Sequence, residues 1–95
     1  MIDINSYVIV RTYSAGCFAG ILTERNGREV LLTNARRLWE WYGAASLSEL
    51  AARGPSLPEQ CKFAVPVTVL LLEAIEIIDA AQGRTSIESV PIWSR

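Results

Sequence analysis

Short stretches of alternating or clustered apolar residues occupy the first third of the chain and predict antiparallel β-strands. The first runs from Tyr7 to Tyr13, the second from Gly16 to Glu24 and the third from Arg28 to Thr33. Each is rich in β-branched or aromatic residues, which pack well on a pleated surface. Asn26-Gly27 is a dipeptide typical of a tight hairpin turn. Gly20, in the middle of a strand, indicates a sharp bend or a close approach of another backbone segment.

Helical spacing appears next and predicts one helix of about two turns. Ser46 and Glu49 stand three positions apart, as in a capping box, where each side chain bonds a backbone N–H at the helix start. Leu47 and Leu50 share one face. Gly54-Pro55 ends the helix, because glycine caps a helix C-terminus and proline cannot continue it.

The second half predicts further strands at residues 63–69 and 70–78. Pro66 has no N–H to donate, so its strand lies at an edge or bends there. Residues 79–90 leave two alternatives open. Gln82-Gly83 indicates a turn, and Thr85 to Glu88 begins either another short helix or a last strand that ends at Trp93.

Five or so short strands, one hairpin and a mid-strand glycine are features of a small barrel of the SH3 type. The spacing Gly16-x-Phe18-x-Gly20-x-Leu22, then Gly27-x-x-Val30-x-Leu32, resembles the first half of the Sm-like fold, whose barrels pair strand edges between subunits. The turn that holds a base in Sm-like proteins is Arg28-Glu29 here, and their basic-glycine pair is missing near residues 70–72. We therefore carry over the shape and not the RNA binding. The predicted fold class is mainly β with one or two short helices, a small SH3-like or Sm-like antiparallel barrel.

Composition favours a single domain over residues 1–95 that assembles into a homo-oligomer. A chain of 95 residues closes one core. Hydrophobic residues make up 51% of it. Counted with glycine and without tyrosine, the apolar share exceeds the range of about 45–50% that is usual for soluble domains. A second copy of the chain would cover the surplus apolar surface; the alternative is an unusually apolar monomer.

Charge and apolar run lengths exclude several partners and locations. The net charge of −1 provides no field that draws nucleic acid or an anionic membrane. The longest apolar run, residues 67–72, is far shorter than a membrane span, and the N-terminus has no signal-peptide pattern. We expect a cytoplasmic protein with no membrane partner, in which Cys17 and Cys61 are reduced thiols.

The residue types present argue against an enzyme. Histidine is absent, which removes the usual general base and metal ligand. Two cysteines are too few for a zinc site, and no glycine-rich phosphate loop is present. Glu73 and Glu76 would face opposite sides of a strand. We therefore predict no catalytic residue, no metal and no cofactor.

Arginines and aromatic residues gather between Asn34 and Gly43 and suggest a nucleotide site. Paired guanidiniums clamp a phosphate, and indole or phenol rings stack on a base. An extended chain would place Arg37, Trp39 and Trp41 on one side, whereas a helix would bring Arg36 close to Trp39. In the competing interpretation the indoles fill the core or subunit contacts and the arginines pair with surface glutamates. Arg11 and Tyr13, before the small residues of the first turn, are further candidates. The predicted ligand-binding residues are Arg11, Tyr13, Arg36, Arg37, Trp39, Trp41 and Tyr42.

Several strings resemble a family of small phage and prophage proteins, DUF6948. They are Val8 to Gly16, Phe18-Ala-Gly20, Ala35 to Trp39, Gly43 to Ser48 and Ser86 to Val90. The resemblance implies phage origin, a location in the host cytoplasm and no known enzymatic role.

These observations favour a non-enzymatic, phage-encoded protein that sequesters a nucleotide-type immune signal of the infected host. Its expected partners are other copies of itself and a nucleotide-like small molecule. One alternative is a structural, assembly or interaction protein of a phage without a small-molecule ligand. Another is an Sm-like nucleic-acid-binding ring, which the near-zero net charge disfavours.

Overall fold

The computed structural model describes residues 2–94 and contains a six-stranded antiparallel sheet with two short α-helices. The mainly β prediction is thus confirmed. The elements, in chain order, are β1 (Tyr7–Thr12), β2 (Cys17–Asn26), β3 (Glu29–Glu40), α1 (Leu47–Arg53), the 3-10 turn η1 (Pro58–Gln60), β4 (Lys62–Phe63), β5 (Val67–Leu71), β6 (Ala74–Asp79) and α2 (Arg84–Glu88).

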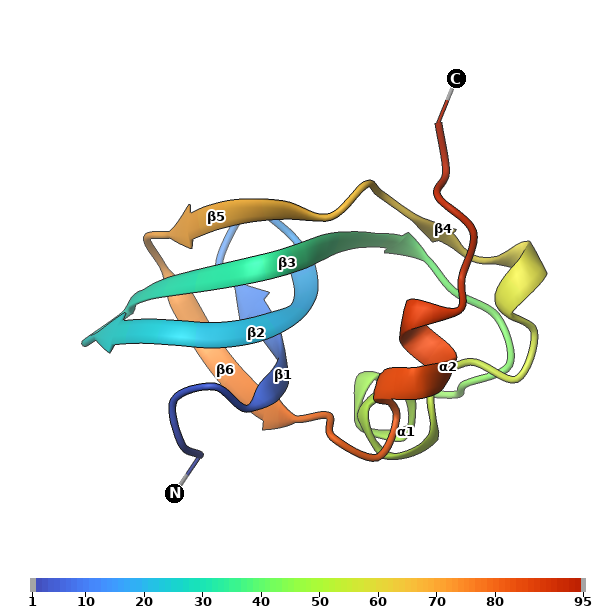
Figure 1. Ribbon diagram of the computed structural model, residues 1–95, viewed down its shortest axis with the longest axis horizontal. Coiled ribbons are helices and arrows are strands. Elements are labelled where there is room, and N and C mark those ends of the chain that lie inside the picture. The colour runs from blue at the N-terminus through green and yellow to red at the C-terminus, as the bar shows by residue number, and fades with distance from the viewer. Residues whose placement is uncertain (1, 95) are drawn as a thin grey trace.

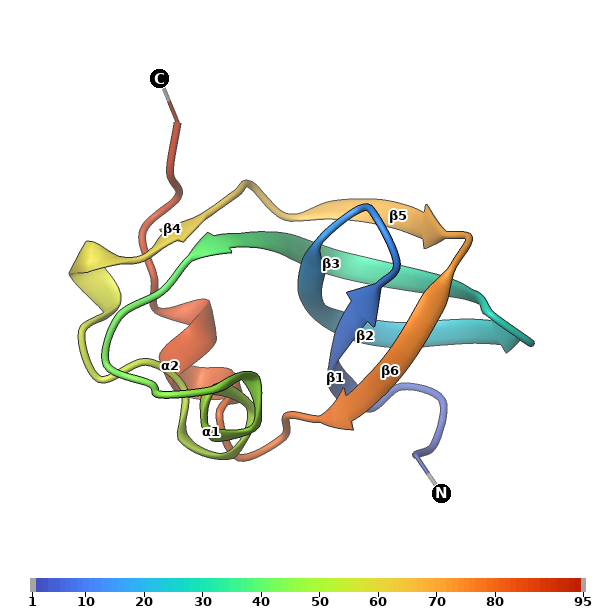
Figure 2. The same cartoon turned by 180° about the vertical axis from the view of Figure 1, so that it is seen from behind.

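The sheet is strongly twisted, with strand order β4-β3-β2-β1-β6 and with β5 also paired to β3. Figure 1 shows β2, β3 and β5 running side by side, while β1 and β6 cross behind them at a steep angle. Figure 2 shows the same two strands from the other side. The N–H of Ala74 donates to the carbonyl of Arg28 at 3.0 Å, so the start of β6 is tied to the hairpin between β2 and β3.

Two apolar cores lie on opposite faces of the sheet, and β1 contributes to both because its side chains alternate. Val8 and Val10 face the inside of the curved sheet, and Tyr7 and Ile9 face the helices. The inner core consists of Val8, Val10, Phe18, Leu22, Val30, Leu32, Ala35 and Leu71. The helix-side core consists of Tyr7, Ile9, Ala19, Leu38, Leu50, Ala51, Cys61, Phe63, Ala80, Ile87 and Val90.

A β-bulge in β3 explains the glycine in β2. Ile21 pairs with Thr33 and Ala19 with Arg36, so β3 has one extra residue between these pairs. Asn34, in that interval, has a φ of 50°, a left-handed value that asparagine tolerates. The backbone of the bulge lies very close to Gly20. This confirms the close backbone approach predicted from the mid-strand glycine.

The hairpin turn lies one residue later than predicted. Asn26 pairs with Glu29 at the end of the strands, so the two turn residues are Gly27 and Arg28. Gly27 has a φ of 62°. Type II′ hairpins take glycine at this first turn position, because a side chain is disfavoured there.

The predicted strand over residues 63–69 is two strands, β4 and β5. Residues 64–66 between them have no strand pairing, and Pro66 has no N–H to offer the edge of β3. The predicted run over 70–78 is also divided, since Glu73 lies in the two-residue connection between β5 and β6. β3, in contrast, continues to Glu40 and is longer than predicted.

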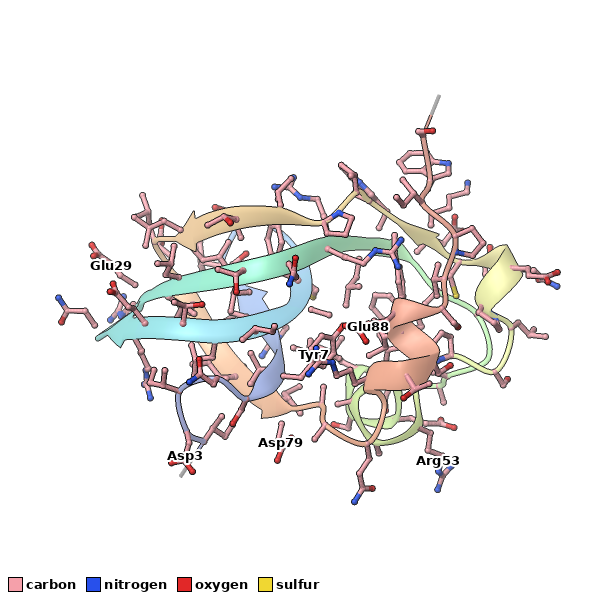
Figure 3. All side chains as sticks on the ribbon, in the orientation of Figure 1. Asp3, Tyr7, Glu29, Arg53, Asp79 and Glu88 are labelled. Carbon is pink, nitrogen blue, oxygen red and sulfur yellow. The ribbon has the colours of Figure 1, made fainter. Side chains whose placement is uncertain are left out.

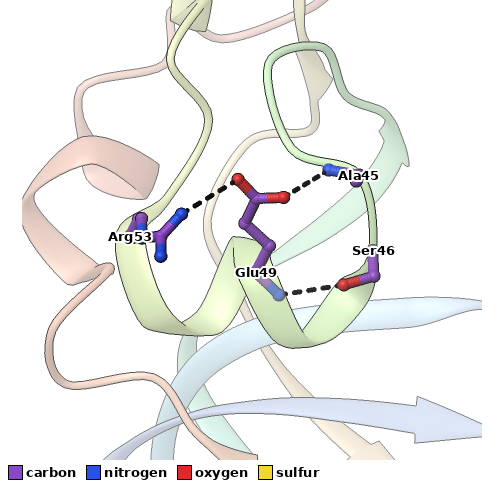
Figure 4. A network of polar contacts seen from close by, with 4 residues as sticks. All are labelled: Ala45, Ser46, Glu49 and Arg53. Atoms are coloured by element: carbon purple, nitrogen blue, oxygen red, sulfur yellow. Dashed lines mark hydrogen bonds and ion pairs between the residues drawn. The ribbon is translucent and has the colours of Figure 1, made fainter.

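Helix α1 begins and ends at capping contacts. The Ser46 hydroxyl accepts from the N–H of Glu49 at 3.1 Å, and the Glu49 carboxylate accepts from the N–H of Ala45 at 2.9 Å (Figure 4). The other carboxylate oxygen contacts Arg53 at 3.4 Å, and Gly54 caps the C-terminus with a φ of 73°. The predicted helix is therefore confirmed. Residues 84–88 form the second helix, the first of the two alternatives.

Cys17 and Cys61 are not joined by a disulfide. No helix within residues 2–94 has the length and apolar character needed to cross a membrane.

We expect Gly20→Ala to destabilise the fold. A Cβ at this position would lie 2.8 Å from the Cα of Ala35 and 3.0 Å from the carbonyl oxygen of Thr33, and backbone atoms cannot move aside cheaply. The free energy of unfolding should fall by at least about 2 kcal/mol in urea denaturation. Gly27→Ala is the comparison, since its Cβ would meet nothing within 4 Å. Its positive φ should cost about 1 kcal/mol. Equal losses for the two variants would contradict the crowding argument.

Candidate functional site

The bulge places Arg37 and Trp39 on one face of β3, and there they contact each other. The guanidinium carbon of Arg37 lies 4.7 Å from the ring centroid of Phe18 and 5.8 Å from that of Trp39. Arg37 is half-buried, and its guanidinium has no hydrogen bond or ion pair with any residue from 2 to 94. Its donors are therefore available to a ligand, while the aromatic rings hold the group in place.

Trp93 packs beside Trp39, and we call Phe18, Trp39 and Trp93 the aromatic row. Trp93 was not among the candidates predicted from the sequence. The two ring centroids are 6.1 Å apart and nearly perpendicular, with an interplanar angle of 65°. The N–H of Trp93 donates to the carbonyl of Phe63 at 2.9 Å, which holds the C-terminal segment beside β4. Lys62 lies 5.7 Å from the Trp93 ring and pairs with Glu40 at 3.2 Å. No local pattern around Trp93 indicates this contact.

A cavity of about 320 Å³ opens beside Arg37. Its walls come from the turn after β1, from β5 and from the β5–β6 connection. The lining residues are Thr12, Ser14, Ala15, Arg37, Val69, Leu70, Leu71, Leu72 and Glu73. The cavity combines the Arg37 cation, the Ser14 hydroxyl and the Glu73 carboxylate with an apolar wall from β5. Its volume lies within the range of small-molecule sites, about 300–1,000 Å³.

Arg36 lies on the opposite face of β3 and is bound by the protein itself. The side chain is 4% exposed, and its five N–H donors are used by backbone carbonyls. The acceptors are Ala64, Phe63, Ile87, Val90 and Pro91, at distances from 2.7 to 3.3 Å. Burial lowers the pKa of this guanidinium. The two arginines do not form a paired clamp, so we leave Arg36 out of the candidate site.

Trp41 and Tyr42, beyond the end of β3, do not line the Arg37 cavity. Trp41 is half-buried and packs against the helix-side core. The Tyr42 hydroxyl donates to the Glu40 carboxylate at 2.6 Å. This hydrogen bond lowers the pKa of Glu40 and raises the pKa of Tyr42. Tyr42 is exposed. Its partner Glu40 also pairs with Lys62, the lysine that lies over the Trp93 ring.

Arg11 and Tyr13 are not among the residues that line the Arg37 cavity. Arg11 is opposite Glu76 in the β1–β6 pairing and forms an exposed ion pair with it at 3.0 Å. Tyr13 is 75% exposed, and its N–H donates to the carbonyl of Glu73 at the rim of the cavity. Of the seven predicted residues, the structure thus brings Arg37 and Trp39 together.

A second cavity of about 320 Å³ lies on the Arg36 face, lined in part by Tyr7, Asn34 and Glu88. Figure 3 shows Tyr7 and Glu88 close together beside α2. The Tyr7 hydroxyl is buried and has no hydrogen-bond partner among the described residues. Burial, and then the negative charge of Glu88, raise the pKa of Tyr7 to about 12.

The environment of Cys17 does not activate its thiol. Burial raises the pKa of the Cys17 thiol, which disfavours the nucleophilic thiolate at neutral pH. Within residues 2–94, no three acidic, cysteine or histidine side chains gather closely enough to hold a metal ion.

The fold and this site define a class of protein: small, mainly β, with a cationic and aromatic row beside a cavity. The chain belongs to the family described as a domain of unknown function (DUF6948), whose model matches residues 5–87. This match confirms the resemblance seen in the sequence. It includes Arg37 and Trp39 and ends before Trp93. No curated protein and no solved structure matches the chain significantly.

We expect Arg36→Met to destabilise the protein strongly. Several buried carbonyls would lose their donor, and each unsatisfied group costs about 1–3 kcal/mol. The free energy of unfolding should fall by about 3 kcal/mol or more in denaturant titration. Arg36→Lys should recover part of this loss, since an ammonium has three donors in place of five. Arg53→Met, at an exposed arginine on α1, should change stability by less than about 0.5 kcal/mol.

We expect stability to decline in alkali because of Tyr7. An unfolded tyrosine ionises near pH 10.0, whereas folded Tyr7 keeps its proton to about 12. Between these values the folded state binds more protons, so the free energy of unfolding falls as pH rises, by up to about 1.4 kcal/mol per pH unit. Tyr7→Phe should remove this slope. Tyr13→Phe, at an exposed ring, should retain it; an unchanged slope in Tyr7→Phe would contradict the assignment.

Proposed function

We propose that this protein binds a nucleotide-type immune signalling molecule in the cytoplasm of an infected host and sequesters it without catalysis. The observation that carries the proposal is the Arg37 guanidinium. It is held between Phe18 and Trp39, has no carboxylate partner among the described residues, and lines a cavity of about 320 Å³. A phosphate is the ligand group that such a guanidinium binds best, through parallel N–H donors.

The surroundings of Arg37 favour a nucleotide over a simple phosphate. The exposed indole of Trp39, 59% accessible, presents a surface on which a base can stack. Glu73 lines the same cavity and can accept a hydrogen bond from a ribose hydroxyl, as acidic residues do in dinucleotide sites. Ser14 supplies a hydroxyl beside the phosphate position.

Sequestration needs a stoichiometric site and no reacting group, which suits a chain without histidine. The family resemblance implies a phage setting, where removal of a host alarm signal would benefit the virus. The ligand would leave the complex chemically unchanged, and this property separates a binding protein from a degrading enzyme.

The proposal includes an SH3-like or Sm-like barrel that assembles into a homo-oligomer. The barrel is supported by the strand order and by the bond from Ala74 to Arg28, which draws β6 toward the β2–β3 hairpin. Self-association is supported by the number of large apolar side chains left exposed on one small chain.

A structural or assembly protein is the second candidate function. The edge-to-face pair of Trp39 and Trp93, both partly exposed, suits a protein contact as well as a stacked base. In this case small ligands would have no effect, and Trp39→Ala would weaken a protein complex instead.

We expect the purified protein to bind at least one member of a nucleotide panel in isothermal titration calorimetry. The panel contains cyclic AMP, cyclic di-GMP, cyclic di-AMP and cyclic ADP-ribose, and chromatography should recover the bound compound intact. Arg37→Ala should weaken binding about 10- to 100-fold, the value of a charged hydrogen bond. Trp39→Ala should weaken it about 10-fold through lost stacking.

Arg53→Ala is the matched control and should leave affinity unchanged, since this exposed arginine lies on α1. Absence of binding across the panel, or full affinity in both Arg37→Ala and Trp39→Ala, would refute the proposed site. Recovery of a cleaved compound would indicate an enzyme.

A further inference from the structure

The cavity on the Arg36 face of β3, about 320 Å³ in volume, is separate from the Arg37 cavity. Its lining residues come from β1, from the bulge in β3, from the connection between β4 and β5 and from the chain at and after the end of α2. The two cavities share no lining residue, and the turn between β2 and β3 contributes to neither. The Arg36 face therefore has a chemistry of its own.

The hydroxyl of Tyr7 is the unusual group at this cavity. Tyr7 is 3% exposed, and its hydroxyl has no hydrogen-bond partner among residues 2–94. The residue begins on β1, whereas Arg36 and Glu88, whose charges act on the hydroxyl, belong to β3 and α2. The far end of the ring is thus the part that reaches the cavity. Because native proteins rarely bury a hydroxyl without a partner, a group that enters from the cavity would complete its hydrogen bonding.

Arg84 holds the ring of Tyr7 and the carboxylate of Glu88 near each other. Its guanidinium carbon lies 5.0 Å from the centroid of the Tyr7 ring, and its Nε donates to Oε2 of Glu88 at 3.2 Å. The other oxygen of Glu88 accepts no hydrogen bond from residues 2–94. Figure 3 shows Tyr7 and Glu88 close together beside α2. The cavity therefore has a hydroxyl donor and a carboxylate acceptor at one end.

The charges around the cavity favour an uncharged ligand. Arg36 lines the cavity, but its five donors are used by backbone carbonyls, so it cannot clamp an anion. The negative charge of Glu88 repels a phosphate or a carboxylate, and the positive charges of Arg36 and Arg84 repel an ammonium group. An apolar wall completes the cavity and consists of Pro66, Val90 and Ile92.

We propose that this cavity binds a small uncharged molecule that carries an amide on a ring. The lactam edge of a nucleobase and the carboxamide of nicotinamide share this chemistry. The amide carbonyl accepts from the Tyr7 hydroxyl, and the adjacent N–H donates to the free oxygen of Glu88. The side-chain amide of Asn34, which also lines the cavity, has both a donor and an acceptor for the same group. The ring of the ligand packs against the apolar wall.

This site goes beyond the proposed function and does not depend on it. It lies on the other face of β3 from Arg37 and requires no phosphate. Uncharged probes therefore test it separately from the nucleotide panel, and either site can fail while the other stands.

The test titrates isotope-labelled protein with nicotinamide, uracil and guanosine and follows the backbone N–H signals by NMR. At least one probe should shift the signals of Asn34, Glu88 and Val90, and should leave those of Ser14 and Leu72, at the Arg37 cavity, in place. N,N-dimethylnicotinamide and 1,3-dimethyluracil keep the ring and the carbonyl but lack the N–H, so neither should bind. Ribose, which has hydroxyls and no amide, should not bind either.

Two variants identify the contacts. Tyr7→Phe removes the hydroxyl and retains the ring, and it should weaken the bound probe about 10-fold through one lost hydrogen bond. Glu88→Gln should weaken it several-fold, because a neutral carbonyl accepts more weakly than a carboxylate. Tyr13→Phe and Glu59→Gln, at exposed positions, are the matched controls and should leave the affinity unchanged.

The stability of Tyr7→Phe without ligand is a second readout. In denaturant titration near neutral pH this variant should be at least as stable as the wild-type chain, since it loses only an unpaired hydroxyl. A less stable Tyr7→Phe, together with no binding of any probe, would assign an ordered water to the hydroxyl and would overturn the ligand site.

The remaining outcomes each decide one part of the proposal. No binding across the probes, or signal shifts confined to the Arg37 cavity, would overturn the site. Full affinity in Tyr7→Phe would overturn the hydroxyl as the contact. Equal binding of the dimethylated controls or of ribose would overturn the amide as the recognised group.

Discussion

The buried guanidinium of Arg36 connects parts of the chain that are far apart in sequence. Its five donors bond carbonyls at and just after the ends of β4 and α2, so one side chain fixes the helical end of the molecule to β3. A buried charge is tolerated because each donor has a partner. The C-terminal segment, held in this way, is where Trp93 reaches Trp39. The aromatic row therefore depends on an arginine that does not belong to it.

The bulge at Asn34 decides which of two adjacent arginines is buried. Before the bulge, Val30 and Leu32 face the inner core; after it, Ala35 does, and Arg36 turns to the helix side. Arg37 is thereby left at the cavity with Phe18 and Trp39. One extra residue in the strand thus decides which arginine is structural and which is available to a ligand. The same bulge requires a glycine opposite it, because its backbone approaches β2 too closely for any side chain.

The high apolar content and the candidate ligand cavity meet at β5. This strand supplies the apolar wall of the Arg37 cavity and also has an unpaired edge. The proposed self-association would cover apolar surface of this strand, because the side chains of Val67 and Leu70 are exposed.

The sequence by itself determined the elements whose signals are local. Alternation predicted the strands, the Ser46 and Glu49 spacing predicted the helix start, and Gly20 indicated a close backbone approach. It also indicated that residues 34–43 hold the candidate site, although it grouped Arg36 with Arg37. Tertiary structure decided which of the two is buried, because a bulge reverses side-chain direction without a clear sequence pattern. It also decided the position of Trp93, because contacts between distant segments arise from packing and leave no local periodicity.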